Sequence, residues 1–287
     1  MWTDLAARVD VNKTAQRSGD LHGNLQTRRK VGGFTVTESG YAPKMRIRRH
    51  DHELASICIV LAGGYEEGFG GQNRIRRAAP GVVIVHPEGE HHEETHDPVH
   101  TRLLTVEIET DFLRTLRPSI RALDDAWHRT DYVIAALAYR LRYEIGRDDN
   151  VSALVVESVI HDVLAALDCV RPAESGNAAW LRRVRDLLEV EFQNPPSMTQ
   201  LSTLAGVHPV YLARAFRRRY GCSVGSFVRR LQVGKACVLL EDRPTPLSSV
   251  ATDAGFADQS HMTRRVLDQT GLTPGAWRRR GADSRSK

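Results

Sequence analysis

Seven of the 12 histidines fall between His50 and His100, which makes this part of the chain the first place where the sequence could do chemistry. Three of them, His50, His52 and His92, could place imidazoles around one divalent ion, a usual geometry for zinc or iron. The same side chains could instead line a pocket for a small-molecule effector, or be ordinary structural histidines. On the residues alone these three alternatives stay open.

A second group of polar side chains lies in the segment GFADQSHMTRR, residues 255–265. Gly255 is a helix breaker, and Asp258 is a good residue to cap the helix that follows. Met262 and Val266 are spaced i, i+4 and therefore share the inward face of that helix, which leaves a polar leading face. Such a helix suits a surface that reads another polar molecule.

The motifs of hydrolytic and nucleotide-dependent enzymes are absent from the sequence. It contains no Gly-x-Ser-x-Gly, no phosphate loop and no dinucleotide fingerprint. Ser226 lies in VGSFVRR beside arginines, with no base nearby in the sequence. We therefore predict no catalytic residues and no enzymatic activity.

Strand signals dominate the chain from Val31 to about Ile108. Short apolar runs such as ASICIVLAGG and GVVIVHPEG end in Gly or Pro, and TRLLTVEIE places Leu104, Val106 and Ile108 on one side. Several short strands separated by such turns predict a small sandwich or barrel. Helical periodicity replaces this pattern in residues 131–168 and predicts an antiparallel helix pair.

The last hundred residues contain a weak internal repeat. Residues 200–206 match 249–255 at an offset of 49, and the helices that follow match at an offset of 50, so the second turn has one extra residue. A short helix, a turn with glycine and a helix of about three turns are the elements of a helix-turn-helix. Two such units, joined by a helix over residues 224–242, are a more specific signal than one.

Charge is divided unevenly along the chain. Residues 180–287 carry 18 basic and 9 acidic side chains, a net charge of +9, whereas residues 1–179 carry a net charge of −4. A basic module suggests a polyanionic partner, although a solvated basic surface has the same composition. We expect a loosely ordered leader at 1–30, a β-rich domain with a helical pair at 31–170, a linker at 171–179 and a basic helical domain at 180–287.

Compartment and membrane association follow from what the sequence lacks. The four cysteines are scattered without a C-x-x-C pair, which favours reduced thiols over disulfides or a zinc ribbon. We found no transmembrane-length apolar run and no signal-peptide pattern. A cytoplasmic protein without a membrane partner is expected.

The C-terminal segments HPVYLARAFRRRYGCSVGSFVRRLQVGKACVLL, GFADQSHMTR and TGLTPGAWR resemble the DNA-binding domain of AraC/XylS transcriptional regulators over residues 180–280. The resemblance implies seven helices with two helix-turn-helix units. The implied fold class is α+β with two domains: a small N-terminal β-barrel, cupin-like, with a helical pair, and an all-α C-terminal domain. Two departures from the family pattern are Gln232, where Arg is usual, and Val266, where Phe is usual.

The resemblance also assigns residues to DNA. In a helix-turn-helix the second helix enters the major groove, where side chains read base edges, while arginines contact phosphates without reading sequence. The implied base-reading residues are Val210, Ala213 and Arg214 in the first unit and Gln259, Ser260, His261, Thr263 and Arg264 in the second. The expected phosphate contacts are Arg217, Arg218, Arg229, Arg230 and Arg278.

The histidine segments resemble parts of the two cupin motifs, namely HDH at 50–52 and Gly81-x5-Pro87-x-Gly89-x2-His92. The glutamate expected shortly after His52 is replaced by Ser56 and Ile57. The resemblance implies that residues 31–170 are an effector-binding and dimerisation domain. Because regulators of this family commonly keep the barrel without metal, we expect the histidines to line an effector pocket, with no resident metal and no cofactor. The alternative is a cupin-type metal-binding sensor or metalloenzyme domain fused to a DNA-binding module.

Together these expectations describe a cytoplasmic, sequence-specific transcriptional regulator, an activator of the AraC/XylS type. Its expected partners are double-stranded promoter DNA, a small-molecule effector, RNA polymerase and a second copy of the chain in a homodimer.

Overall fold

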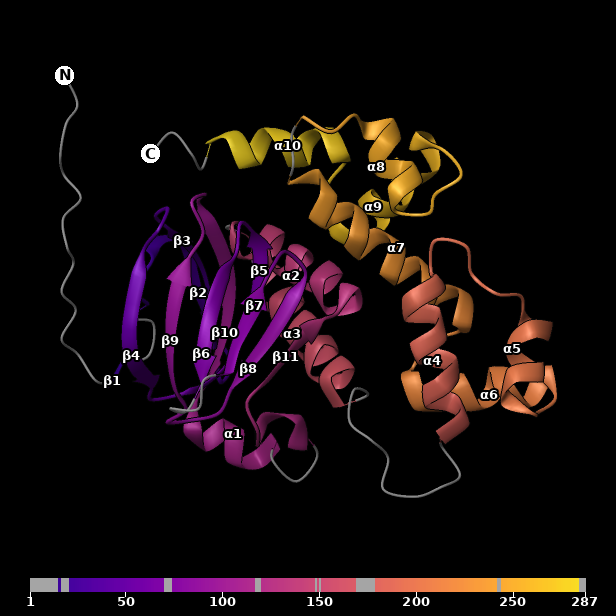
Figure 1. Cartoon of the computed structure of the whole chain (residues 1–287), viewed down its shortest axis with the longest axis horizontal. Helices are drawn as coiled ribbons and strands as arrows, with labels where there is room; N and C mark the ends of the chain where they lie inside the picture. The colour runs from indigo at the N-terminus through magenta and orange to yellow at the C-terminus, as the bar shows by residue number, and fades with distance from the viewer. Residues whose placement is uncertain are drawn as a thin grey trace.

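The chain consists of a β-sandwich, a pair of helices packed on one face of it, and a C-terminal group of helices (Figure 1). We analysed a computed structural model that describes residues 15–16, 21–69, 74–116, 120–147, 149, 151–168, 179–241 and 244–283. Within these ranges no helix is long and apolar enough to cross a membrane.

Two sheets form the sandwich. The five-stranded sheet has the order β1-β4-β9-β6-β7, and the six-stranded sheet has the order β11-β8-β5-β10-β3-β2. Among the described strands, no pairing joins the two sheets, so the expected barrel is realised as an open sandwich. The strands are β1 (Ala15–Gln16), β2 (Asn24–Val31), β3 (Phe34–Tyr41), β4 (Arg46–His52), β5 (Ala55–Ala62), β6 (Tyr65–Phe69), β7 (Arg74–Ala78), β8 (Val82–His86), β9 (His91–His96), β10 (Thr101–Ile108) and β11 (Trp127–Thr130).

Alternation along the strands divides the apolar side chains between two cores. In β10, Leu104, Val106 and Ile108 face the helices, as their spacing predicted, while Leu103 lies in the core between the sheets. Because successive side chains of a strand point to opposite faces, one apolar run can supply both cores. The space between the sheets also holds buried histidines and glutamates, which is unusual for a sandwich interior.

Two long helices cover the six-stranded sheet. They are α2 (Tyr132–Ile145) and α3 (Ser152–Asp168), the expected antiparallel pair. Asp131 caps α2 by accepting hydrogen bonds from the backbone N–H groups of Val133 and Ile134 at 3.0 and 3.1 Å. Two shorter elements, α1 (Thr110–Leu116) and the 3₁₀ turn η1 (Arg121–Leu123), precede them.

Seven helices form the described residues of the C-terminal part, 179–241 and 244–283, which confirms the number expected. They are α4 (Ala179–Glu191), α5 (Met198–Ala205), α6 (Pro209–Tyr220), α7 (Val224–Leu240), α8 (Leu247–Asp253), α9 (Gln259–Thr270) and α10 (Pro274–Asp283). The α5–α6 and α8–α9 pairs are the two halves of the repeat, and α7 connects them (Figure 1). The Ser197–Gln200 capping box and the Asp258 cap are both present.

The turns of the two units explain their glycines. Gly206 and Gly255 have φ angles of 66° and 81°, in the left-handed region that favours glycine. Two residues lie between Gly206 and the start of α6, and three lie between Gly255 and the start of α9. The second turn therefore has the one extra residue that was expected.

The N-terminal part differs from the expected leader at 1–30. Asn24–Val31 form β2, an edge strand paired antiparallel with β3. Its sequence, NLQTRRKV, is polar because one edge of the strand and much of its surface face solvent, so it lacks the apolar signal by which a strand is recognised. Residues 1–14 and 17–20, and nearly all of the expected linker at 171–179, lie outside the described residues.

Candidate functional site

The leading faces of α6 and α9 are exposed in both units of the repeat. In α9, Gln259, Ser260 and Arg264 are exposed, while Met262 and Val266 are fully buried. In α6, Val210, Ala213 and Arg214 are exposed, and Leu212 and Phe216 are buried. Both helices therefore combine an anchored face with a face free to contact a partner.

His261 and Thr263 are less accessible than their neighbours. The His261 ring packs edge-on against Phe256, with ring centroids 5.4 Å apart. The Thr263 hydroxyl donates to the carbonyl of Gln259 at 2.8 Å, which leaves its methyl group outermost. Of the five residues expected to read bases in the second unit, Gln259, Ser260 and Arg264 are the most accessible.

The arginines expected at phosphates fall into two groups. Arg217 and Arg218 are exposed near the C-terminal end of α6. Arg229 and Arg230 are half-buried on α7, and Arg229 donates to the Ser226 hydroxyl at 3.2 Å. Arg278 is half-buried and donates to the carbonyl of Thr245, so an internal contact already occupies it.

Gln232 ties the two helix-turn-helix units together. Its side-chain amide donates to the carbonyl of Phe192, after α4, at 3.2 Å and to the carbonyl of Gly255 at 2.8 Å. Gln232 is buried, and its amide contacts the turn that precedes α9. The glutamine that departs from the family pattern therefore has a structural role in this chain.

Four histidines and a glutamate meet between the sheets, a group that we call the sandwich cluster: His50, His52, Glu67, His86 and His92. The ring of His92 lies 4.3 Å from that of His50 and 5.0 Å from that of His52, between centroids. The structure thus brings together the three histidines singled out in the sequence. It adds His86, whose ring stacks on His92 at 4.3 Å, and Glu67.

Burial and charge set the protonation of this cluster. Burial, followed by the neighbouring His86 and His50, lowers the pKa of His52 to about 3. Burial and the same kind of neighbours hold the pKa of His92 well below its usual value. Although burial opposes it, the Glu67 carboxylate raises the pKa of His86 well above the usual value. At neutral pH, His52 and His92 are therefore neutral, and their ring nitrogens include an unprotonated one.

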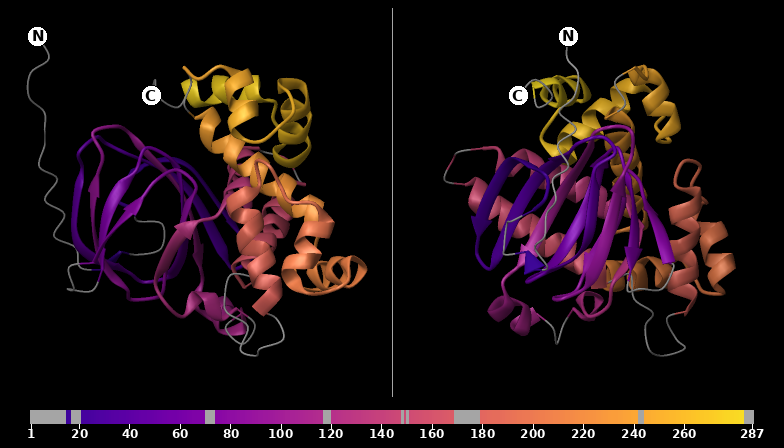
Figure 2. Two further views of the ribbon diagram at one scale, coloured as in Figure 1. Left: turned by 45° about the vertical axis from the view of Figure 1, so that its right-hand side comes forward. Right: turned by 60° about the vertical axis from the view of Figure 1, so that its left-hand side comes forward.

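The C-terminal helices pack directly on the sandwich helices, with α7 lying along α2 (Figure 2). The closest approach is at Gly234, in the middle of α7. A Cβ atom at this position would lie 1.8 Å from the carbonyl oxygen of Tyr132. Only glycine allows the two backbones to come so close.

A buried ionic network closes this interface at the C-terminal end of α7. The Glu241 carboxylate accepts from Arg102 of β10 at 2.5 Å, from Arg142 of α2 at 3.2 Å, and from the Trp277 indole of α10 at 2.9 Å. Glu38 of β3 accepts a further hydrogen bond from Arg142 at 2.8 Å. One carboxylate on α7 therefore joins the sheet, the helix pair and the last helix.

The two helix-turn-helix units are docked to different extents. Apolar residues of α7, α8, α9 and α10 belong to the same core as the helix-facing side of the six-stranded sheet. The first unit, α4 to α6, has a separate core to which α2 contributes Tyr132 and Val133. The second unit thus shares a hydrophobic core with the sandwich, whereas the first unit has a core largely of its own.

Comparison with known proteins bears on the C-terminal part. A sequence model described as a helix-turn-helix domain matches residues 201–280, which span α5 to α10 up to its seventh residue. The chain carries an AraC-family helix-turn-helix domain.

Two curated relatives of this AraC-family domain are named as regulators. The HTH-type transcriptional regulator GlxA of Rhizobium meliloti is 30% identical over 104 residues, which cover 36% of this chain and 32% of the relative. The HTH-type transcriptional activator RhaR of Escherichia coli (strain K12) is 25% identical over 91 residues, 32% of each chain. The match thus spans about a third of the length of these curated relatives.

Solved structures resemble the chain at low scores. ToxT from Vibrio cholerae O395 matches 84% of this chain and 95% of its own, with 10% identity and a TM-score of 0.38. The AraC-like transcriptional activator CuxR matches 71% of this chain and 76% of its own, with 11% identity and a TM-score of 0.40. Scores this low do not establish a shared arrangement of domains.

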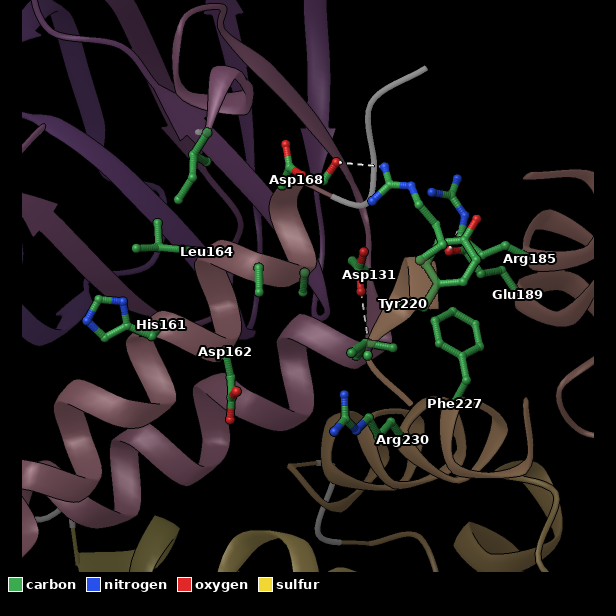
Figure 3. Close-up of a pocket in the computed structure, with 16 residues that line it drawn as sticks. Asp131, His161, Asp162, Leu164, Asp168, Arg185, Glu189, Tyr220, Phe227 and Arg230 are labelled. Carbon is green, nitrogen blue, oxygen red and sulfur yellow. Dashed lines mark hydrogen bonds and ion pairs between the residues drawn. The ribbon is translucent and has the colours of Figure 1, made fainter. Parts of the chain in front are cut away.

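A cavity of about 490 Å³ separates the first unit of the AraC-family domain from the helix pair (Figure 3). Leu164 and Asp162 of α3 line one side, and Tyr220, Phe227 and Arg230 line the other. Its size is in the range of ligand sites, ~300–1,000 Å³. The Arg219 side chain bridges the two sides by donating to the carbonyl of Asp168 at 3.3 Å.

Sequence reasoning missed the residues that depend on long-range packing: Glu67, Arg102, Arg142, Gly234 and Glu241. A signal existed for Glu67, because Tyr65, Glu67 and Phe69 share one face of a short strand, and a carboxylate between two inward aromatics is unusual. No local pattern marks the other four.

Proposed function

We propose that this chain is a sequence-specific DNA-binding transcriptional regulator that reads two successive stretches of promoter DNA with α6 and α9. The observation that carries the proposal is the repeated presentation of one exposed helix face from two equivalent, anchored helix-turn-helix units. Because the curated relatives match only through this region, the activity of the whole chain is part of the proposal. No catalytic role is assigned.

The exposed side chains favour different bases in the two units. Gln pairs with adenine and Arg with guanine through two hydrogen bonds, which supports Gln259 and Arg264 as readers in the second unit. In the first unit Arg214 suits guanine, and the apolar Val210 and Ala213 suit the methyl group of thymine. The proposed first half-site is therefore recognised through one arginine and apolar contacts.

Replacing Arg264 with alanine is expected to weaken binding to the preferred DNA by about 1–3 kcal/mol and to relax preference at one base pair. Replacing Arg218 is expected to weaken all sequences alike and to lower the slope of log affinity against log salt by about 1. Both arginines are exposed, so folding should be unaffected. Fluorescence anisotropy with fragments selected from genomic DNA and with random DNA measures both effects.

Equal losses on selected and random DNA for both variants would overturn the role of Arg264 as a reader. Failure of the chain to enrich any fragment over random DNA would overturn the proposed function itself.

The proposed effector site is the sandwich cluster, which contains the histidines expected to line an effector pocket. Its influence would reach the DNA-binding helices through the core that the sheet shares with α7 to α10. A ligand shifts an equilibrium only by binding one arrangement better than another. The first unit, which has a core of its own, is the part proposed to change position.

A homodimer is proposed through α3. The other long helix, α2, is covered by α3, α7, α9 and the sheet, so its surface is not available in this arrangement. Val151, directly before α3, and Leu154, in the first turn of α3, are 62% and 68% exposed. The proposal places the regulator in the cytoplasm, with RNA polymerase as a further partner.

Replacing Leu154 with glutamate is expected to convert the dimer to a monomer, because a charge would enter an apolar contact. Val190 on α4, equally apolar and 77% exposed, provides the matched control, and its replacement by glutamate should leave the dimer intact. Light scattering after size-exclusion chromatography gives the mass directly. An unchanged dimer in the Leu154 variant would place the interface elsewhere.

A further inference from the structure

We propose that Glu67, His86 and His92 bind a divalent first-row transition-metal ion between the two sheets. The three side chains come from β6, β8 and β9, and all are at most 1% exposed. One ligand atom from each can be chosen so that all three atoms lie within 4.8 Å of one another.

The distances are close to those that a metal site requires. His86 Nε2 lies 2.6 Å from Glu67 Oε1, and His92 Nε2 lies 3.9 Å from the same oxygen. Ligand bonds of about 2.1 Å at tetrahedral angles separate neighbouring ligand atoms by about 3.4 Å. An ion would spread the first pair and draw in the second by less than about 1 Å each, which side-chain rotation can provide.

Two of the ligand residues have buried atoms with unused hydrogen-bonding capacity. Oε2 of Glu67 and Nε2 of His92 have no hydrogen-bond partner among the described residues. A buried polar atom left without a partner costs about 1–3 kcal/mol, so two of them need an explanation. A metal ion held by both oxygens of Glu67 and by Nε2 of His92 would satisfy both atoms, because carboxylate oxygens and imidazole nitrogens are its ordinary ligands.

This set differs from the one that the histidine motifs indicate. His50, His52 and His92 also have ligand atoms within 4.8 Å of one another, but the set contains no carboxylate. Three neutral imidazoles would leave the charge of a dication uncompensated in this buried site, whereas the Glu67 carboxylate offsets part of it. His52 is also half-buried rather than buried.

The carboxylate that the motif lacks near Ser56 is therefore supplied by a different strand. Glu67 lies on β6, next to β9 in the five-stranded sheet, where Glu67 is paired with Glu94. On the opposite sheet, Cys58 of β5 lies 3.8 Å from Nδ1 of His86 and helps to orient that ring with Nε2 toward Glu67. Partners of this kind fix the orientation of ligating histidines.

Two imidazoles and one carboxylate select the class of metal. Imidazole suits zinc, iron, cobalt and nickel, whereas magnesium and calcium prefer oxygen ligands throughout. The proposed ion is therefore a divalent transition metal of the kind that imidazole binds, and not magnesium or calcium. Its assignment as the effector rests on the proposed regulatory function; its binding does not.

Binding can be measured with Co²⁺ and Zn²⁺ on the full chain after chelator treatment. We expect one Co²⁺ per chain, a visible absorption band typical of nitrogen and oxygen ligands, and displacement by Zn²⁺. Glu67→Gln and His86→Ala should each weaken Zn²⁺ at least about 10- to 100-fold, the loss known for perturbed metal sites. His91→Ala, an exposed histidine next to His92, is the matched control and should bind like the unaltered chain.

His52→Ala separates the two candidate sets. The proposal expects near-normal affinity from this variant; loss of binding in His52→Ala with retention in Glu67→Gln would overturn it in favour of the motif set. A chain that binds less than one equivalent, or equally weak binding by His91→Ala, would also overturn it. Glu67→Gln keeps the side-chain volume, and circular dichroism checks that this variant is folded. Zn²⁺ should raise the unfolding temperature of the unaltered chain, and a folded Glu67→Gln variant without this rise has lost metal binding and not its fold.

DNA binding is measured separately, on selected fragments with and without Zn²⁺. Fragment binding without any response to metal would leave the DNA-reading function standing and overturn only the effector assignment. Metal binding without enrichment of any DNA fragment would leave the metal site standing and overturn the proposed DNA-reading function.

Discussion

Replacing Glu241 with alanine is expected to lower the free energy of unfolding by about 3–5 kcal/mol, the usual cost of removing one partner from a buried ion pair. The variant removes the carboxylate that Arg102 and Arg142 share, and it leaves the Trp277 indole without this acceptor. All of these groups are largely buried, so water cannot readily replace the carboxylate. Urea unfolding followed by circular dichroism measures the loss.

Two further variants make the Glu241 experiment specific. Glu241→Gln keeps an acceptor for Trp277 but removes the charge, and should recover only part of the loss. Asp111→Ala removes the exposed Asp111–Arg114 pair, 3.0 Å long, and should cost no more than about 1 kcal/mol. A similar small loss for Glu241→Ala would mean that the network does not hold the interface. Hydrogen exchange should show that α7 and α10 open first, because Glu241 connects them to the sheet.

Replacing Gly234 with alanine is expected to destabilise the chain by about 1–3 kcal/mol, the usual cost of overpacking a filled core. The sign is informative, because alanine in a helix interior is otherwise favoured over glycine by about 1 kcal/mol. The new methyl group would meet the carbonyl oxygen of Tyr132, which belongs to backbone and cannot rotate away. The helices α2 and α7 must therefore move apart.

Gly225 in the first turn of the same helix is the matched control. A Cβ atom there would meet only the Arg229 side chain, at 3.4 Å, so alanine should be neutral or slightly stabilising. The unfolding temperatures of the two variants should shift in opposite directions. A stabilised Gly234→Ala variant would show that α2 and α7 are not held together as closely as the structure describes.

Much of the fold could be predicted because it is encoded locally. The alternation of Leu104 and Val106 marks the strand and its face, and the repeat with its caps at Ser197 and Asp258 marks the helix-turn-helix units. The strand β2 was not predicted, because an edge strand does not need an alternating apolar pattern. The position of an element at a sheet edge is a property of its neighbours, not of its own sequence.

The candidate sites were predictable only in part, for a related reason. His50, His52 and His92 are close together, as their motif spacing suggested, but Glu67 and His86 join them through pairing between strands. Glu241 and Gly234 depend on which helix packs against which. The apolar face of α7 predicts that this helix packs against another element, but nothing in its sequence indicates that the element is α2.

The packing of α7 against α2 limits modular exchange between the two halves of the chain. A fragment beginning at α4 would uncover Val233, Ala236, Cys237 and Leu240, side chains that now lie in the core shared with the sandwich. Exposed apolar surfaces of this kind promote self-association. Joining the C-terminal half to another N-terminal domain would therefore require a domain that also brings a helix shaped to receive Gly234. The two halves are therefore expected to change together in evolution.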